Sequence, residues 1–184
     1  MRRDLVEAAR SGDHEAFEAL AIASVDRLYA VARLMLRDTD RAEDAVQEAL
    51  VHAWRQLPTI RDPERFDAWL YRLLVNACAD VGRRSRRWSA EVRVLRAEPT
   101  SADSAASLAD RDQLERGFRR LKPEQRAVVV LHHYLGLTIP EVAEVVGIPP
   151  GTAKSRLHYA MEVLRAALEA DDRSPSVTTN ERMA

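Results

Sequence analysis

Apolar residues recur every three or four positions along most of the chain, which is the spacing of one face of an α-helix. This pattern predicts a short helix before residue 11 and longer helical segments over residues 13–36, 41–57, 64–87 and 122–134. No segment shows the convincing alternation of apolar and polar residues that indicates a β-strand. The sequence therefore predicts an all-α protein.

The helical pattern is interrupted once in the middle of the chain and ends before the C-terminus. Residues 89–113 are rich in Ala, Ser and Asp and poor in large apolar side chains, which is typical of a flexible linker. Residues 171–184 show no apolar period, and we expect a disordered tail there. The chain is thus predicted to consist of two small helical domains, 1–88 and 114–170, joined by a flexible linker.

Composition and charge exclude several classes of protein. The chain has 184 residues with 28 basic and 29 acidic side chains, so it is not a globally basic nucleic-acid coat protein. A single cysteine, Cys78, excludes an intramolecular disulfide framework and a cysteine-based zinc site. No segment approaches the roughly 20 apolar residues of a membrane helix, and the N-terminus lacks the apolar core of a secretion signal. We expect a cytoplasmic protein with no membrane insertion.

The stretch from residue 138 to 164 has the pattern of a helix-turn-helix. Thr138 and Glu141 have the spacing of a capping box, which predicts a helix that begins at Ile139. Gly147 permits the backbone angles of a tight turn, and a longer helix follows. This arrangement is typical of DNA-binding proteins. The apolar face of the second helix is formed by Ala153, Leu157, Ala160 and Leu164.

The opposite face of this second helix carries the side chains that we expect to contact DNA. The N-terminal end of such a helix enters the major groove, where cations meet phosphates and polar or aromatic side chains reach base edges. A plain helical hairpin with a solvated polar face is the alternative. The candidate DNA-binding residues are Thr152, Lys154, Ser155, Arg156, His158 and Tyr159.

The helix predicted over residues 41–57 has a second, polar face. Glu43, Asp44, Gln47, Glu48 and Val51 lie on one stripe, which an ordinary solvated helix would also explain. Glu48 and His52 are four residues apart, but the carboxylate count and histidine spacing do not match a di-iron bundle. We therefore predict no metal site.

The helix predicted over residues 64–87 ends in a basic run. Arg83, Arg84 and Arg87 belong to a segment of four arginines in five residues, which suits a nucleic-acid backbone. The helix dipole favours cations at a C-terminus and would explain one or two of them. The edge of the helix that leads to this run carries Arg72, Asn76 and Asp80.

Three aromatic residues, Phe66, Trp69 and Tyr71, lie near the start of the same helix, next to a loop bracketed by prolines. They can be core residues. The alternative is an aromatic-walled loop that holds unstacked bases. The sequence pattern alone leaves both interpretations open.

Taken together, these motifs resemble the sigma-70 family of bacterial RNA polymerase sigma factors, in particular its small extracytoplasmic-function (ECF) group. The resemblance rests on AEDAVQEA, NACADVGRR and GTAKSRL in that order, and the matching stretches cover about nine-tenths of the chain. It implies two helical domains, called domain 2 and domain 4, and a role in transcription initiation.

The resemblance also implies roles for single residues. Asp44, Gln47 and Glu48 match the helix that docks on the clamp helices of the largest subunit of core polymerase. The loop 58–66, which includes Phe66, matches the element that captures flipped −10 bases. The other −10 candidates are Asn76, Asp80, Arg83, Arg84 and Arg87, and the −35 candidates are the residues of the second helix given above.

We therefore predict a sigma factor that binds core polymerase, recognises −10 and −35 promoter elements and promotes initiation. Its partners would be core polymerase, promoter DNA and an anti-sigma factor, with no cofactor. We find no catalytic constellation and predict that the chain is not an enzyme. Two alternatives are a stand-alone helix-turn-helix regulator and a helical enzyme built around the face from Glu43 to His52.

Overall fold

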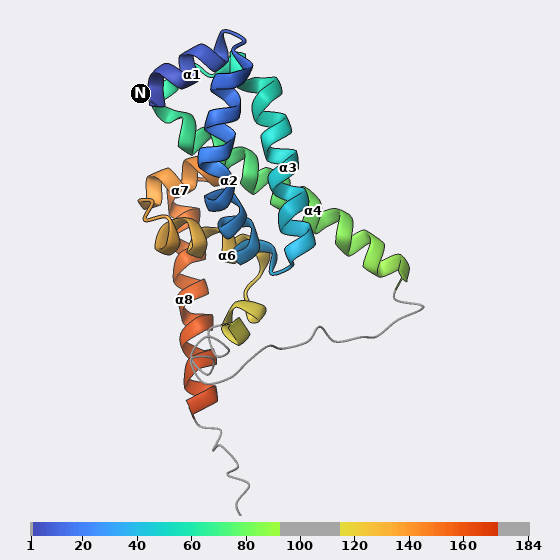
Figure 1. Cartoon of the computed structure of the whole chain (residues 1–184). Coiled ribbons are helices and arrows are strands. Elements are labelled where there is room, and N and C mark those ends of the chain that lie inside the picture. The colour runs from blue at the N-terminus through green and yellow to red at the C-terminus, as the bar shows by residue number, and fades with distance from the viewer. Residues whose placement is uncertain (1, 93–114, 173–184) are drawn as a thin grey trace, which may run out of the picture.

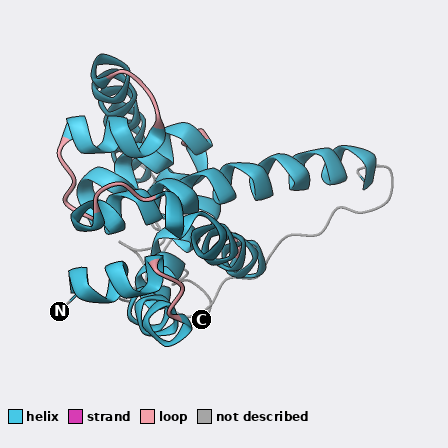
Figure 2. Cartoon of the chain, turned by 90° about the horizontal axis from the view of Figure 1, so that it is seen from above, coloured by secondary structure: helices cyan, strands magenta, loops and turns pink. Residues whose placement is uncertain are grey.

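A computed structural model describes residues 2–92 and 115–172, and this part of the chain contains helices and no strands (Figure 2). The predicted all-α class is confirmed. The elements of the N-terminal half are α1 (Arg2–Arg10), α2 (His14–Leu36), α3 (Thr39–Gln56), the 3-10 turns η1 (Leu57–Thr59) and η2 (Pro63–Arg65), and α4 (Phe66–Val92). Those of the C-terminal half are α6 (Pro123–Val129), the π-helical η3 (Val130–Tyr134), α7 (Ile139–Val146) and α8 (Pro150–Asp172).

The N-terminal half is a bundle of α2, α3 and α4, with α1 packed across one end of α2 (Figure 1). The face of α3 that meets its neighbours is almost entirely alanine, and Ala42, Ala45, Ala49 and Ala53 are fully buried. Small side chains let the backbones of packed helices approach one another closely. The opposite face of α3 is consequently left outside the bundle, and it carries the predicted acidic stripe.

Aspartates begin two of these helices. The side chain of Asp13 accepts a hydrogen bond from the backbone N–H of Ala16, and Asp38 does the same for Arg41. Both satisfy a first-turn N–H that has no partner within the helix. The Asp38 cap places the start of α3 at Thr39, two residues before the predicted start.

The C-terminal half is built on α8, which packs against α6 and α7. The sequence predicts one helix from residue 122 to Tyr134, whereas the last turn of that helix is widened into the π-helical η3. The N–H of Leu135 donates to the carbonyl of Val130, five residues back, at 3.2 Å. His132 Nδ1 lies 2.7 Å from the carbonyl oxygen of Leu137 and helps to hold the turn that follows.

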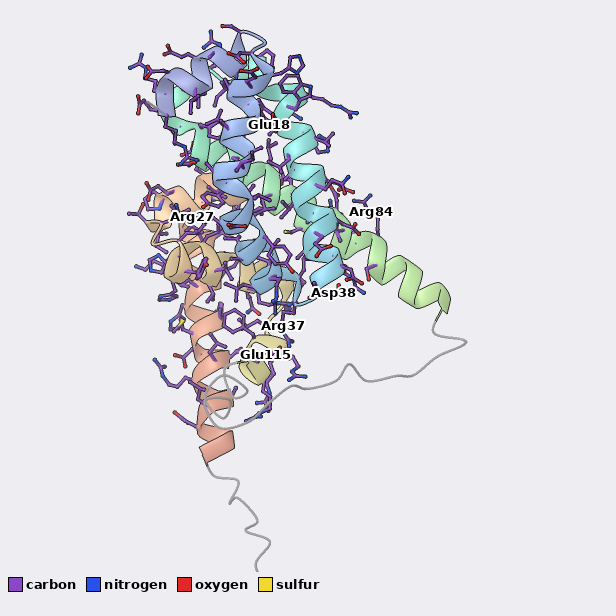
Figure 3. The ribbon with its side chains drawn as sticks, viewed as in Figure 1. Glu18, Arg27, Arg37, Asp38, Arg84 and Glu115 are labelled. Atoms are coloured by element: carbon purple, nitrogen blue, oxygen red, sulfur yellow. The ribbon has the colours of Figure 1, made fainter. Side chains whose placement is uncertain are left out.

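The two halves pack against each other. α7 lies against α4, and α6 and η3 lie against α2 (Figure 1). Buried residues of both halves, including Leu74 and Leu131, form one apolar cluster. Arg37 at the end of α2 also forms an ion pair with Glu115 at 3.0 Å, and both residues are labelled in Figure 3.

The predicted linker and tail fall mostly outside the described residues. α4 continues to Val92, five residues beyond the helix end predicted at Arg87. Residues 93–114 and 173–184 are not described, so the predicted flexibility of the linker and disorder of the tail stay predictions.

Candidate nucleic-acid and polymerase interface

A charged cleft of about 830 Å³ lies between the outer faces of α3 and α4. The acidic stripe of α3 forms one wall, and the arginine-bearing edge of α4 forms the other. The cleft thus brings together two sets of residues that were predicted for two different partners. It is lined by Asp44, Gln47, Glu48, Val51, His52, Arg55, Asp80, Arg83 and Arg84.

Arg84 and Glu48 bridge the two walls. One guanidinium nitrogen of Arg84 donates to both carboxylate oxygens of Glu48, at 2.5 and 2.6 Å. The hydrogen bond and the negative charge of Glu48 raise the pKa of Arg84 above its ordinary value, and the charges of Asp80 and Asp44 contribute less. Figure 3 shows Arg84 on α4, beside α3.

The remaining −10 candidates on α4 occupy different environments. Arg83 pairs with Asp80 one turn back on the same helix. Asn76 is exposed on the surface of α4. Arg87 belongs to α4, but its side chain lies outside the described part of the structure.

An apolar groove of about 1130 Å³ lies next to the charged cleft, between α2 and α3. The aromatic side chains Phe17, Tyr29 and Trp54 contribute to its wall, and Gln47 and Val51 line both the groove and the cleft. The groove was not predicted from the sequence. The available signal was a set of large apolar residues outside the core stripe, of which Val51 is 40% exposed.

The loop that precedes α4 is anchored by apolar residues. Leu57, Ile60 and Phe66 are buried, whereas the residues between them are mostly exposed. Phe66 is only 3% exposed and contacts the ring of Trp69, so this aromatic residue is part of the core. In this arrangement the Phe66 ring is not available to a DNA base.

The helix-turn-helix is formed by α7, the turn at Gly147 and α8, as predicted. The carboxylate of Glu141 accepts hydrogen bonds from the backbone N–H of Thr138 at 2.8 Å and from its hydroxyl at 2.6 Å. These hydrogen bonds lower the pKa of Glu141. Gly147 ends α7 in the left-handed region with φ of 73°, where glycine pays no penalty for a Cβ atom.

The N-terminal turns of α8 present the predicted DNA-binding side chains to solvent. Lys154, Ser155, His158 and Tyr159 are exposed, and Thr152 and Arg156 are half-buried. The opposite face is buried against the rest of the second half through Ala153, Ala160 and Leu164. The predicted DNA-binding side chains thus lie on the face of α8 that points away from its buried residues.

No group of three or more His, Cys, Asp or Glu side chains is placed to hold a metal ion within residues 2–92 and 115–172. None of the described helices combines the length and the apolar character that a membrane span requires.

Comparison with known proteins identifies the family. The family model for sigma-70 region 2 matches residues 21–89, and that for sigma-70 region 4 matches residues 111–164. The chain is 34% identical over 161 residues to the ECF RNA polymerase sigma factor SigM of Mycobacterium tuberculosis, with 83% of this chain and 77% of SigM covered. The chain belongs to the ECF sigma factors of the sigma-70 family.

Two solved structures share the fold of this chain. The sigma factor RpoE from Bartonella quintana, solved in complex with the anti-sigma factor NepR, matches with a TM-score of 0.67 and 25% identity over 84% of this chain and 98% of RpoE. CnrH, solved in complex with the cytosolic domain of CnrY, matches with a TM-score of 0.66 and 29% identity over 92% of this chain and 98% of CnrH. As an ECF sigma factor, the chain acts with RNA polymerase and promoter DNA in transcription initiation.

Proposed function

We propose that this ECF sigma factor docks on core polymerase through the exposed face of α3 and contacts the promoter through α4 and α8. In this proposal the chain is a cytoplasmic initiation factor without catalytic activity of its own. Residues 1–88 form the domain that binds the polymerase and the −10 element, and residues 114–170 form the domain that binds the −35 element.

The observation that supports the docking role most directly is the outer face of α3. Asp44 and Gln47 are exposed and Glu48 is partly exposed, whereas the alanines on the opposite face of the helix are buried in the bundle. Acidic residues suit a basic partner surface, and charges at the rim of an interface steer association. The neighbouring apolar groove adds the hydrophobic contact area that a stable protein interface needs.

The promoter roles are distributed over two surfaces. The exposed polar residues at the start of α8 fit the major groove at the −35 element. In this proposal the loop 58–66 holds the flipped bases of the −10 element. The other residues assigned to the −10 element lie on α4: Asn76, Asp80, Arg83, Arg84 and Arg87. Phe66 supports that loop from the core.

An anti-sigma factor is the further partner that we propose. RpoE and CnrH were each solved with another protein, NepR and the cytosolic domain of CnrY respectively. The apolar groove between α2 and α3 is a surface that such a partner can cover. If it did so, it would compete with polymerase, because Gln47 and Val51 belong to both the groove and the charged cleft.

A binding measurement with core polymerase tests the docking role. The double variant Asp44→Asn, Glu48→Gln removes two charges from the outer face of α3 and should weaken binding to core polymerase at least several-fold. The control is Glu7→Gln, Glu15→Gln, which makes the same charge change at exposed positions of α1 and α2. Equal core affinity for the two double variants would contradict the proposal.

A further inference from the structure

The pair formed by Arg84 and Glu48 joins two proposed binding functions. Glu48 belongs to the polymerase-docking face of α3, and Arg84 belongs to the DNA-binding edge of α4. They are 36 residues apart in sequence, and both oxygens of the carboxylate are engaged by one guanidinium nitrogen. In the free protein Arg84 therefore neutralises the charge that Glu48 would offer to the polymerase. Glu48 likewise neutralises the charge that Arg84 would offer to DNA.

The neighbouring cation, Arg83, is different in this respect. Its partner is Asp80, which lies on α4 itself and faces the same cleft. A protein that binds the outer face of α3 does not need to break the pair of Arg83 and Asp80, because both residues lie on α4. Only Arg84 of these two arginines is paired with the proposed polymerase-docking face.

The exposure of the pair makes an exchange of partners feasible. The side chain of Arg84 is 61% exposed and that of Glu48 is 34% exposed. Ion pairs at this level of exposure contribute little net stability, because water and salt screen them. A cationic group of a docked protein, or a DNA phosphate, can replace one member at small cost. A deeply buried pair would be locked instead.

We propose that the Arg84–Glu48 pair couples polymerase docking to DNA binding: a cationic group of the polymerase takes Glu48, and Arg84 is released to a DNA phosphate. This inference rests on the proposed function, because it uses the docking role of Glu48 and the DNA role of Arg84. By thermodynamic reciprocity, a phosphate that takes Arg84 also frees Glu48 for the polymerase. Free protein would thus bind DNA less well than its cationic surface allows.

A double-mutant cycle on the full-length protein tests the coupling. The probe is a short fluorescein-labelled DNA duplex of arbitrary sequence, because phosphate contacts do not depend on sequence. Without polymerase, Glu48→Gln should raise DNA affinity by about two- to fivefold, which is the weight of an exposed ion pair expressed as an affinity ratio. The salt dependence of log K should also steepen by about one unit, as expected for one added phosphate contact.

Two further variants isolate the cause. In an Arg84→Gln background, Glu48→Gln should add no more than a general charge effect. That effect is measured by Glu15→Gln, which removes one exposed charge in the first turn of α2. Arg84→Gln alone should bind core polymerase about two- to fivefold more tightly, because Glu48 is no longer occupied.

The outcomes separate the coupling from the proposed function. If Glu48→Gln leaves core binding unchanged, the docking role of Glu48 fails, and the coupling fails with it. If Glu48→Gln weakens core binding but changes DNA affinity and salt slope no more than Glu15→Gln does, the docking role stands and the coupling is overturned. An equal gain in DNA affinity with and without Arg84 overturns the coupling as well.

Discussion

Arg65, in the turn before α4, donates a hydrogen bond to Glu144 of α7 and so connects the two halves of the chain across 79 positions of sequence. The side chains of both residues are about half exposed. The pair joins the loop 58–66 to α7, the first helix of the helix-turn-helix, near the contact between α7 and α4. The loop and the helix-turn-helix are therefore in contact in this arrangement.

We expect this ion pair to contribute little to stability. Removing either partner, in Arg65→Gln or Glu144→Gln, should lower the free energy of unfolding by less than about 1 kcal/mol, because the pair is exposed to solvent and salt. Urea denaturation of the two single variants and the double variant measures the coupling. A coupling energy well above about 1 kcal/mol would contradict the assignment of an exposed, screened pair.

The apolar contact between the halves should weigh more. Val145 is 2% exposed, whereas its neighbour Val146 is half-buried. Val145→Ala should lower the free energy of unfolding by about 1 to 3 kcal/mol, and Val146→Ala should cost less. The two substitutions remove the same atoms at adjacent positions, so each is the control for the other. The reverse order of effects would mean that α7 does not pack on the N-terminal half in solution.

The same two valines show what a sequence pattern can and cannot predict. The periodicity of residues 139–146 assigns Val142, Ala143 and Val146 to the inner face of α7, and Val142 and Ala143 are indeed buried. Val145 falls outside that pattern, yet it is buried in the apolar cluster to which both halves contribute, and no local pattern encodes that packing. The helix-turn-helix and its capping residues were predictable, since their signals lie within a few residues of one another.

Other differences have the same origin. The π-helical turn at Val130–Tyr134 and the apolar groove between α2 and α3 arise from packing between elements. The two walls of the charged cleft were predictable as two separate charged helix faces. The ion pair of Arg84 and Glu48 across the cleft was not predictable, because the two residues lie on helices whose relative position is fixed only by the fold.

Gly147 is the position where the helix-turn-helix depends on glycine. Its φ of 73° lies in the left-handed region, which costs a residue with a Cβ atom about 1–2 kcal/mol. Gly147→Ala should lower the free energy of unfolding by that amount. Gly151→Ala is the matched control, because Gly151 lies in the helix α8 and a Cβ atom there meets nothing within 4 Å. Equal stability of the Gly147 variant and the wild type would contradict the cap geometry.

Lys154 should act through a phosphate rather than a base. Lys154→Ala should weaken binding to −35 duplexes of different sequence by a similar factor and reduce the salt slope by about one unit. Lys122→Ala removes the only other lysine of the chain and serves as the control, because Lys122 lies at the start of α6. An unaltered salt slope for Lys154→Ala would remove this lysine from the phosphate contacts.

The single cysteine predicts a pH dependence of stability. Burial raises the pKa of the Cys78 thiol to about 12, whereas the thiol of an unfolded chain has a pKa of about 8.5. The folded state therefore holds this proton more tightly. The resulting stability is fully present below the unfolded pKa and is lost as the pH rises toward the folded value.

We expect the advantage of the wild type over Cys78→Ala in free energy of unfolding to shrink as the pH is raised through this window. Denaturant titrations of both proteins at a series of alkaline pH values measure the difference. A difference that stays constant with pH would show that the thiol is not held neutral by the fold.

Run-off transcription with purified core RNA polymerase tests the central claim most directly. Genomic DNA fragments would be transcribed by core enzyme with and without the full-length chain. We predict transcripts with defined 5′ ends only when the chain is present, and their loss with the Asp44→Asn, Glu48→Gln double variant. Failure of the wild-type chain to direct core polymerase to any defined start site would contradict the account.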